Sequence, residues 1–454
     1  MKSYDSIIVG AGLTGLTAAY RLILQGKRVL LLEAAERTGG QIHTHTEAGF
    51  TFESGPNTGV LSNAAVVDLF EKLSPTCNVE VAHPAAKRRL IWKKNGFRAL
   101  PSGLLSGVST PLFAFKDKLR ILLEPFRAKG TNPNESVGEL AKRRLGKSFV
   151  DYAVDPFISG IYAGDPYKLV TRYALPKLYN LEQQHGSFIR GTIAKAKQPK
   201  TEEEKRATKE VFSAKGGLQR LTDALAKQVG EENIILSAKH VAVMPSDEAG
   251  YTVRFEHKGE QHCYEAKRVI TTCGAYALPE VLPFLSAERL APITCLNYAP
   301  VVQVCVCIAQ NKDKLPKAFG GLIPSLEKKE ALGILFPSDC FQGRTPSDEG
   351  KLYSFFFGGM KKLHFIEQSD EEIREQTLEL LHDLFGYPQD VQPDVLRIFR
   401  HQHAIPQYDD HTGQRFEAIE TIERDYPGLS LAGNIKGGIS MADRIRQAYE
   451  LTKP

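Results

Sequence analysis

Gly10-Ala11-Gly12-Leu13-Thr14-Gly15 is the stretch that decides the fold of this 454-residue chain. The apolar, β-branched run at residues 6–9 precedes it and is typical of a buried parallel strand, and residues 16–25 have the pattern of a helix. A second strand is expected at residues 28–32, and Glu33 ends it. Strand, glycine loop, helix, strand and terminal acid, in that order, predict a Rossmann-like dinucleotide-binding unit.

Each glycine of this loop has a physical task. Gly10 permits the tight turn, Gly12 lets the backbone approach a pyrophosphate, and Gly15 allows the helix to pack closely on the strand. The N–H groups of Leu13 and Thr14 belong to the helix N-terminus, where the dipole favours an anion. Glu33 is expected to accept hydrogen bonds from the adenosine ribose, which argues against the 2′-phosphate of NADP.

Composition places the chain among ordinary globular proteins with two or three domains. It is 42% hydrophobic and 24% charged with a net charge of +5, and its basic residues are dispersed, so no nucleic-acid partner is expected. Its seven cysteines form no C-x-x-C pair, which favours neither a zinc site nor a disulfide framework and fits reduced thiols in the cytoplasm. No signal peptide is recognised at the N-terminus. The uncharged run at residues 290–310 is interpreted as a buried strand and not as a membrane span.

Residues 33–40 specify the dinucleotide. Their pattern, Glu-x3-Arg-x-Gly-Gly, resembles the motif of the flavin amine oxidase superfamily, which implies FAD as the cofactor. The resemblance implies that Arg37 neutralises a phosphate and that the backbone of Gly39, Gly40 and Gln41 runs beside the flavin.

The C-terminal region resembles the same superfamily. Residues 428–434 read as a strand into a loop, and a Gly-rich turn at residues 435–440 opens the last helix. In the superfamily this turn closes over the flavin, with positive helix dipole near the N1–C2=O edge. The cofactor contacts that this implies are Gly433, Asn434, Gly438, Ile439 and Ser440, together with the backbone of Val241 near the adenine.

Three further segments resemble the protoporphyrinogen oxidases of this superfamily. Residues 53–57 contain Gly55-Pro56-Asn57, expected at the cofactor, and residues 97–104 resemble the stretch that precedes that family's helical domain. The most specific is residues 154–166, which contain Pro-Phe-Ile-Ser-Gly-Ile-Tyr-Ala-Gly-Asp-Pro.

This resemblance implies oxidation of protoporphyrinogen IX to protoporphyrin IX in haem synthesis. Hydride passes to flavin N5 three times, and dioxygen reoxidises the flavin. Arg98 is the candidate for a propionate, Phe157 and Ile161 for an apolar slot with the strand around residues 355–357, and Gly164 for close approach. No general base and no metal ligand are assigned. Coproporphyrinogen III, an amine substrate, and a flavoprotein without turnover remain alternatives.

The predicted architecture is α/β with three parts. A discontinuous FAD-binding domain is expected at residues 1–85, 205–290 and 400–454, a helical domain at 90–200, and an α+β substrate domain at 291–399. Residues 104–127 combine apolar and basic side chains, which fits either a peripheral membrane contact or an internal helical face. Residues 195–209 are expected to be a flexible link, and a homodimer is left open. The pairs His43/His45 and His401/His403 are interpreted as polar positions near the flavin, without a third metal ligand.

Overall fold

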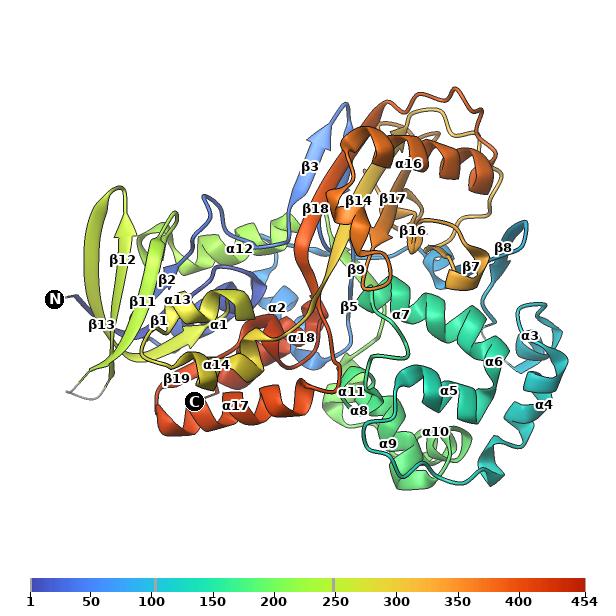
Figure 1. Ribbon diagram of the computed structural model, residues 1–454. Coiled ribbons are helices and arrows are strands. Elements are labelled where there is room, and N and C mark those ends of the chain that lie inside the picture. The colour runs from blue at the N-terminus through green and yellow to red at the C-terminus, as the bar shows by residue number, and fades with distance from the viewer. Residues whose placement is uncertain (1, 102–103, 247–249, 454) are drawn as a thin grey trace.

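A mostly parallel sheet with helices on both faces is built from strands of both ends and the middle of the chain (Figure 1). The computed structural model describes residues 2–101, 104–246 and 250–453. The parallel strands, in spatial order, are β10 (Ile234–Ile235), β2 (Val29–Leu32), β1 (Lys2–Val9), β13 (Glu260–Thr271) and β19 (Leu429–Leu431). The antiparallel strands β12 (Gly250–His257) and β11 (Lys239–Ser246) extend the sheet beyond β13. The predicted Rossmann-like fold is confirmed.

Alternating residues of β1 explain why this sheet needs two layers of helices. Ile8 faces a core that includes α1 (Leu13–Leu24), α2 (Ala64–Leu73), α12 (Gln219–Val229) and α18 (Met441–Leu451). Ile7 and Val9 face a second core that includes α13 (Leu278–Val281), α14 (Ala287–Thr294) and α17 (Thr412–Asp425). Because successive side chains of a strand point to opposite faces, an entirely apolar strand is stable only when both faces are covered.

A second seven-stranded sheet forms the substrate-domain side of the molecule. Its spatial order is β18 (Val395–Pro406), β14 (Tyr298–Ile308), β17 (Lys351–Gly358), β16 (Gly333–Leu335), β15 (Gly320–Leu322), β7 (Arg89–Lys93) and β8 (Gly96–Ala99). Only the β15–β7 pair is parallel. The helix α16 (Asp370–Phe385) covers one face, where Phe355 and Phe357 are fully buried.

The third part of the molecule is helical and lies beneath the second sheet in Figure 1. Its elements include α3 (Leu104–Ser109), α4 (Phe115–Leu122), α5 (Val137–Leu145), α6 (Lys147–Phe149), α7 (Asp155–Tyr162), α8 (Thr171–Ala174), α9 (Pro176–His185) and α10 (Phe188–Lys197). A buried ion network fastens them, since Arg144 contacts Glu124 at 2.9 Å and Glu182 at 2.7 Å with none of the three side chains accessible beyond 1%. Such a network resists rearrangement because removal of one partner leaves a buried charge unpaired.

Two of the predicted segments differ from the structure. The run at residues 290–310 is helix α14 and then strand β14, because Ser286 caps a helix that tolerates Pro292 before the alternating β-branched residues begin. The predicted flexible link contains α11 (Glu202–Arg206), which is stabilised by a capping box between Thr201 and Glu204.

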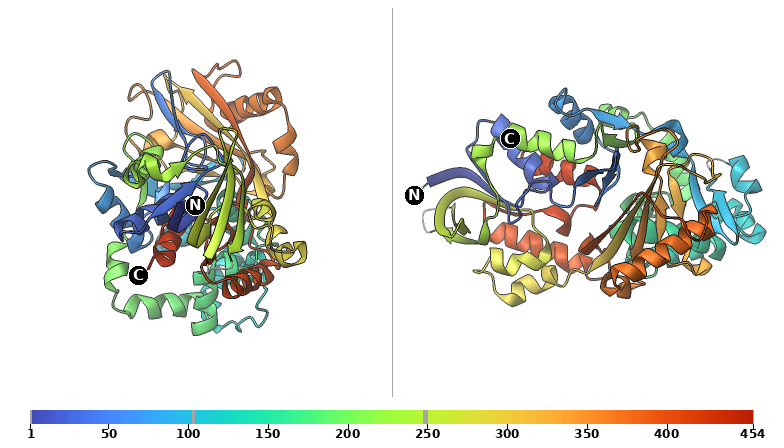
Figure 2. Two further views of the ribbon diagram at one scale, coloured as in Figure 1. Left: turned by 90° about the vertical axis from the view of Figure 1, so that its left-hand side faces the viewer. Right: turned by 90° about the horizontal axis from the view of Figure 1, so that it is seen from above.

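The strands also refine the proposed domain boundaries. Residues 89–99 pair within the second sheet although the helical domain was expected from residue 90, and β18 continues in that sheet to Pro406 although the FAD domain was expected from residue 400. We therefore propose that the helical part begins with α3 and that the chain re-enters the FAD domain after β18. Ser102 and Gly103 lie outside the described residues. From above, β18 runs from the second sheet toward the first (Figure 2). No helix within the described ranges is long and apolar enough to cross a membrane.

Candidate flavin and substrate site

The glycine loop lies at the carboxyl edge of the parallel sheet and leaves room for a phosphate. A Cβ added to Gly12 would meet no atom within 4 Å, whereas one added to Gly15 would come within 1.9 Å of the carbonyl oxygen of Gly10. The first turn of α1 contains no acidic residue, and no side chain caps it. The hydroxyl of Thr14 is buried without a partner. This open, uncapped helix N-terminus fits the pyrophosphate of a dinucleotide.

Glu33 is held at the same edge by two backbone donors. The N–H of Ala11 donates to Oε2 at 2.6 Å, and the N–H of Ala35 donates to Oε1 at 2.9 Å. The backbone carbonyl of Glu33 accepts the N–H of Ala238 at 2.8 Å. This bond brings the start of β11, which contains the buried Val241, close to the predicted adenine side.

The second glycine pair packs on the first loop. A Cβ on Gly40 would lie 3.2 Å from the Cα of Gly12, so the two glycines are in close approach. Arg37 donates to the carbonyls of Gly40, Ile42 and Thr38 at 2.7, 3.0 and 3.1 Å. In this structure its guanidinium therefore braces the loop, and its predicted contact with a phosphate stays a prediction.

Gly55-Pro56-Asn57 joins this loop to the second sheet. A Cβ on Gly55 would lie 2.0 Å from the carbonyl oxygen of Gln41. The hydroxyl of Ser354 in β17 donates to Oδ1 of Asn57 at 2.9 Å, and Nε2 of Gln303 in β14 donates to the carbonyl of Glu53 at 2.8 Å. The predicted flavin segments thus lie against the face of the second sheet opposite α16.

The C-terminal turn reaches the same edge from the other end of the chain. The N–H of Ala432 donates to the carbonyl of Thr271 at 2.8 Å, and the next residue, Thr272, donates its hydroxyl to the carbonyl of Gly10 at 2.9 Å. Gly433 packs on the backbone of Thr272, and Asn434 accepts the hydroxyl of Tyr298 at 3.2 Å. The structure therefore brings the N-terminal and C-terminal glycine turns together, as the resemblance implies.

The residues that begin α18 continue this arrangement. Ser440 caps the helix and forms a capping box with Asp443, and the N–H of Gly438 donates to the hydroxyl of Tyr408 at 2.8 Å. Ile439 packs in one apolar cluster with Ile158 of α7. The turn predicted at the flavin and the helix of residues 154–166 thus pack in the same cluster.

The predicted substrate residues of α7 lie around that cluster. Phe157 is half-buried in it, Ile161 is 40% exposed, and a Cβ on Gly164 would lie 2.6 Å from Oε1 of Gln407. Gln407 in turn donates to the carbonyl of Tyr162 at 2.8 Å. Ile161 is thus available to an apolar ligand, whereas Phe157 is engaged in packing.

Of the phenylalanines in β17, only Phe356 faces the interior between the domains. Phe355 and Phe357 pack beneath α16, while Phe356 contacts a cluster that contains Ala163. The prediction that residues 355–357 could line a slot therefore narrows to Phe356, because alternate side chains of a strand face opposite sides.

Arg98 is exposed on the edge strand β8, on the same face of the sheet as Phe356. Register places its Cα opposite Ile91, whose partner is Leu322, followed by Gly333 and Phe356. A Cβ added to Gly160 of α7 would lie only 2.4 Å from the side chain of Leu322, so α7 packs closely on this part of the sheet. Arg98 is thus placed at the outer end of a row that passes under α7.

Three of the four paired histidines lie beside Ser54, whose N–H donates to the carbonyl of His43 at 3.0 Å. Nε2 of His45 is 3.0 Å from the hydroxyl of Ser54, and Nε2 of His401 is 2.6 Å from its carbonyl oxygen. Burial lowers the pKa of His43, His45 and His401, so these imidazoles are neutral near pH 7. His403 instead stacks on Tyr276 with ring centroids 4.2 Å apart.

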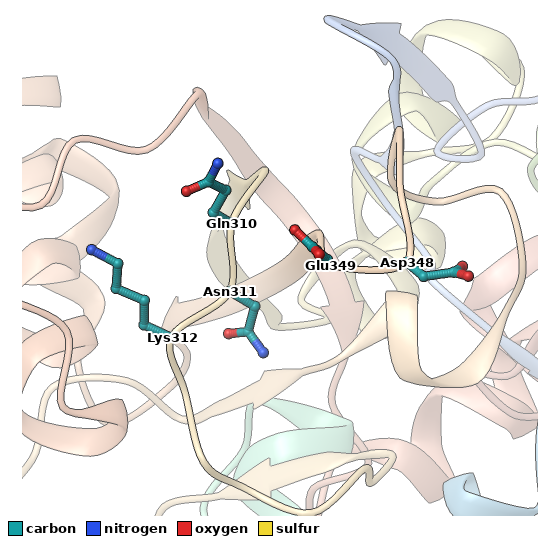
Figure 3. Close-up of a pocket in the computed structure, with 5 residues that line it drawn as sticks. All are labelled: Gln310, Asn311, Lys312, Asp348 and Glu349. Atoms are coloured by element: carbon teal, nitrogen blue, oxygen red, sulfur yellow. The ribbon is translucent and has the colours of Figure 1, made fainter.

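A polar cavity of about 400 Å³ lies elsewhere, at the far end of β14 and β17 (Figure 3). Its lining residues are Gln310, Asn311, Lys312, Asp348 and Glu349. The opposite end of β17, where Met360 donates its N–H to the carbonyl of Ala163 at 2.7 Å, contacts the residues that follow α7. The cavity is therefore separate from the residues predicted to bind the flavin and the substrate.

Sequence reasoning missed Tyr408, Gln407 and Arg444, which hydrogen-bond to the predicted segments. Arg444 donates to the carbonyls of Lys436 and Gly438, both at 2.8 Å. The only sequence signal was their nearness to the final strand or helix, because their partners lie far away along the chain or in an irregular turn.

Comparison with known proteins agrees with this geometry. The model of the family of flavin-containing amine oxidoreductases matches residues 13–441. Protoporphyrinogen oxidase 2 of Arabidopsis thaliana, chloroplastic/mitochondrial, is 30% identical over 96% of this chain and 91% of its own, and human protoporphyrinogen oxidase is 29% identical over 98% and 96%. A crystal structure of an Exiguobacterium protein provisionally named protoporphyrinogen oxidase has a TM-score of 0.80 at 23% identity, covering 99% of this chain and 98% of that one. The chain belongs to the family of flavin-containing amine oxidoreductases, and the relatives it matches at about 30% identity within that family are protoporphyrinogen oxidases.

Proposed function

We propose that this protein is an FAD-dependent oxidase that converts protoporphyrinogen IX to protoporphyrin IX, with dioxygen as the electron acceptor. One observation carries the proposal: Ile439, in the turn that opens α18, packs in one cluster with α7, the helix whose sequence resembles protoporphyrinogen oxidases. The relatives of Arabidopsis and human origin that bear this name match nearly the whole chain.

The residues present fit both the cofactor and a large apolar substrate. When bound, FAD supplies hydride acceptance, which three successive oxidations of a porphyrinogen require. The carboxyl edge with Gly12, Glu33 and the α18 turn would hold it. On the substrate side, Ile161 and Phe356 would contact the macrocycle, and Arg98 would pair with a propionate. The chain's own contribution is positioning, so we assign no general base.

Two other substrates are distinguished by named features. Coproporphyrinogen III carries four propionates and would need more cations than Arg98 at the substrate side. An amine oxidase that holds its flavin covalently would need a cysteine in the C-terminal turn, and residues 428–443 contain none. Likeness to putrescine oxidase, at 16% identity and a TM-score of 0.68, shows the shared fold alone.

The decisive experiment is an aerobic assay with two substrates. The purified, FAD-loaded protein is mixed separately with protoporphyrinogen IX and coproporphyrinogen III, and porphyrin fluorescence is followed against a sample without enzyme. We expect porphyrin fluorescence to increase with protoporphyrinogen IX, and we expect kcat/KM to be at least tenfold lower with coproporphyrinogen III. A reversed preference would favour coproporphyrinogen III as the substrate. No increase in fluorescence with either substrate would reject porphyrinogen oxidation and favour a flavoprotein without this turnover.

We also propose that the protein binds peripherally to a membrane through α4, working from the cytoplasmic side. The proposal is supported by a stripe of exposed apolar side chains at helical spacing, defined here as the α4 stripe: Phe115, Leu119, Leu122, Leu123 and Phe126. The exposed basic residue Lys116 lies beside it, as in segments that rest on anionic lipid.

A further inference from the structure

Two helices begin at the carboxyl edge of the parallel sheet, side by side. α1 follows β1 and α18 follows β19, and the two helices pack on one another in the same core. The hydrogen bonds that link Ala432 to Thr271 and Thr272 to Gly10 fix the two turns near each other. The proposed function places the pyrophosphate of FAD at the start of α1, and the start of α18 would then face another part of the same ligand.

Arg444, in the first turn of α18, forms no ion pair with any carboxylate of the described residues, although the charge of Asp443 acts on it from beyond ion-pair distance. Its guanidinium donates to the carbonyls of Lys436 and Gly438 at 2.8 Å and to Oε1 of Gln447 at 3.0 Å, and its Nε is buried without a partner. All its acceptors are neutral, so its charge acts on whatever lies against the turn.

The neighbouring cations show by contrast how unusual this is. Lys436 is paired with Glu423 at 2.8 Å, and Arg446, two residues along the same helix, is paired with Asp443 at 3.0 Å. Arg446 is exposed, whereas Arg444 is half-buried beneath the glycine turn. Of these three cations, Arg444 alone lies under the turn without forming an ion pair.

Tyr408 connects this turn to the helical part of the molecule. Its hydroxyl accepts the N–H of Gly438 at 2.8 Å, and its backbone carbonyl accepts the N–H of Val170 at 2.8 Å, just after the Ala-Gly-Asp-Pro stretch. The ring is buried in the cluster that holds Ile439, with the guanidinium of Arg415 5.5 Å from its centroid. One residue therefore fixes both the flavin-side turn and the segment that follows α7.

We propose that Arg444 stabilises negative charge on the bound flavin and so raises its reduction potential, and that Tyr408 is the positioning residue that holds the Gly437–Gly438 turn in place for it. Reduction to the anionic form takes up two electrons and one proton, and leaves one negative charge on the ring. A fixed cation nearby stabilises that product relative to the neutral oxidised ring. The inference rests on FAD binding and is independent of the tetrapyrrole substrate.

The test is a redox titration of FAD-loaded protein against a reference dye, without substrate. For Arg444→Gln, we expect the equilibrium constant for two-electron reduction to fall at least tenfold, or about 30 mV. The matched control is Arg446→Gln, which removes the same charge from the outer side of the same helix and should change the constant less than twofold. Equal effects of the two variants would overturn the proposal.

Two further variants separate charge from structure. Tyr408→Phe should lower the constant by a smaller amount, about threefold, and loosen FAD binding, and an unchanged constant would remove Tyr408 from the proposal.

If Arg444→Gln fails to retain FAD, Arg444→His provides the test within one protein, because its charge is lost as the pH rises through about 6.5. Its constant should then fall about tenfold more than that of the parent between pH 5.5 and 8.5, and parallel curves would reject the role of the charge. Because the titration uses no porphyrinogen, a negative result leaves the proposed substrate untouched.

Discussion

At the scale of single residues, Gly12 and Gly15 predict opposite consequences for the same substitution. A Cβ on Gly12 meets open space, and its φ of −73° is accessible to alanine. A Cβ on Gly15 would lie 1.9 Å from a backbone oxygen, so α1 would have to move away from β1. We therefore expect Gly12 to serve ligand binding and Gly15 to serve the packing of α1 on β1.

We expect Gly12→Ala to leave the unfolding free energy of the FAD-free protein within about 0.5 kcal/mol of the parent, and to weaken FAD binding at least tenfold. Gly15→Ala should lower that unfolding free energy by about 1–3 kcal/mol even without FAD. Urea unfolding of the FAD-free protein and FAD titration separate the two effects. Similar destabilisation by both variants would show that the space over Gly12 is not kept for the dinucleotide.

Local residue patterns predicted this loop well because its chemistry is encoded within a few positions. Gly10, Gly12, Gly15 and Glu33 meet through contacts of a strand–turn–helix unit that the sequence itself specifies. Tyr408 and Arg444 were missed because their roles arise from tertiary placement. Tyr408 lies 30 residues from the turn it supports, and nothing in its local sequence separates it from an ordinary buried tyrosine.

At the scale of elements, one cross-strand row orders the substrate side. From β18 to β8 it passes through Phe399, Gln303, Phe356, Gly333, Leu322, Ile91 and Arg98. Directly paired residues of a sheet share a face, so all these side chains point toward α7 and the flavin segments. The row changes from polar and aromatic at the predicted flavin segments, through apolar beneath α7, to cationic at the edge.

This order suits a substrate with an apolar ring and an acidic rim, and it gives Arg98 a binding role only. Arg98→Ala should raise the KM for protoporphyrinogen IX about tenfold and change kcat less than twofold, since a propionate contact is the same in the ground state and the transition state. Lys94→Ala, in the β7–β8 turn and off the row, is the matched control. A lower kcat with unchanged KM would place Arg98 outside the substrate site.

The type of an element was predictable where one hydrophobic periodicity, that of a helix or that of a strand, continued over the whole segment. It was not predictable where a segment changed from one periodicity to the other. The uncharged residues 290–310 hide a boundary between α14 and β14, because their composition does not change where the periodicity does. The polar residues 195–209 form α11 because the Thr201–Glu204 capping box satisfies the helix terminus locally. The pairing of β7 with β15 is a contact across more than 200 residues, which no local pattern specifies.

At the scale of the whole molecule, the helical part is fastened to the second sheet on one side and presents apolar side chains on the other. Asp155 at the start of α7 accepts hydrogen bonds from the N–H and the hydroxyl of Ser325 and forms an ion pair with Lys361. Farther out, Asp117 accepts the hydroxyl of Ser148 at 2.7 Å, and Glu124 is buried against Arg144. The two acids of the α4 segment thus face inward and hold it, while its apolar residues face outward.

An amphipathic helix of a globular protein usually turns its apolar side chains inward and its charged ones outward, whereas the α4 segment has the opposite arrangement. Phe115, Leu122 and Phe126 are 75%, 70% and 79% exposed, although each large apolar side chain gains about 1.5–3 kcal/mol when it is fully buried. A lipid interface would cover the α4 stripe from outside, and α4 lies at the edge of the molecule remote from the parallel sheet (Figure 1). The wild-type protein should therefore sediment with anionic vesicles, and changing these three residues to serine should weaken vesicle binding at least tenfold.

The matched control changes Leu24, Leu326 and Leu363, exposed leucines outside the α4 stripe, to serine and should bind like the parent. Turnover of porphyrinogen in detergent-free solution should be equal in all three proteins, because none of the changed residues touches the flavin or substrate segments. Equal vesicle binding by both triple variants would assign the α4 stripe to another surface role and leave the oxidase proposal intact.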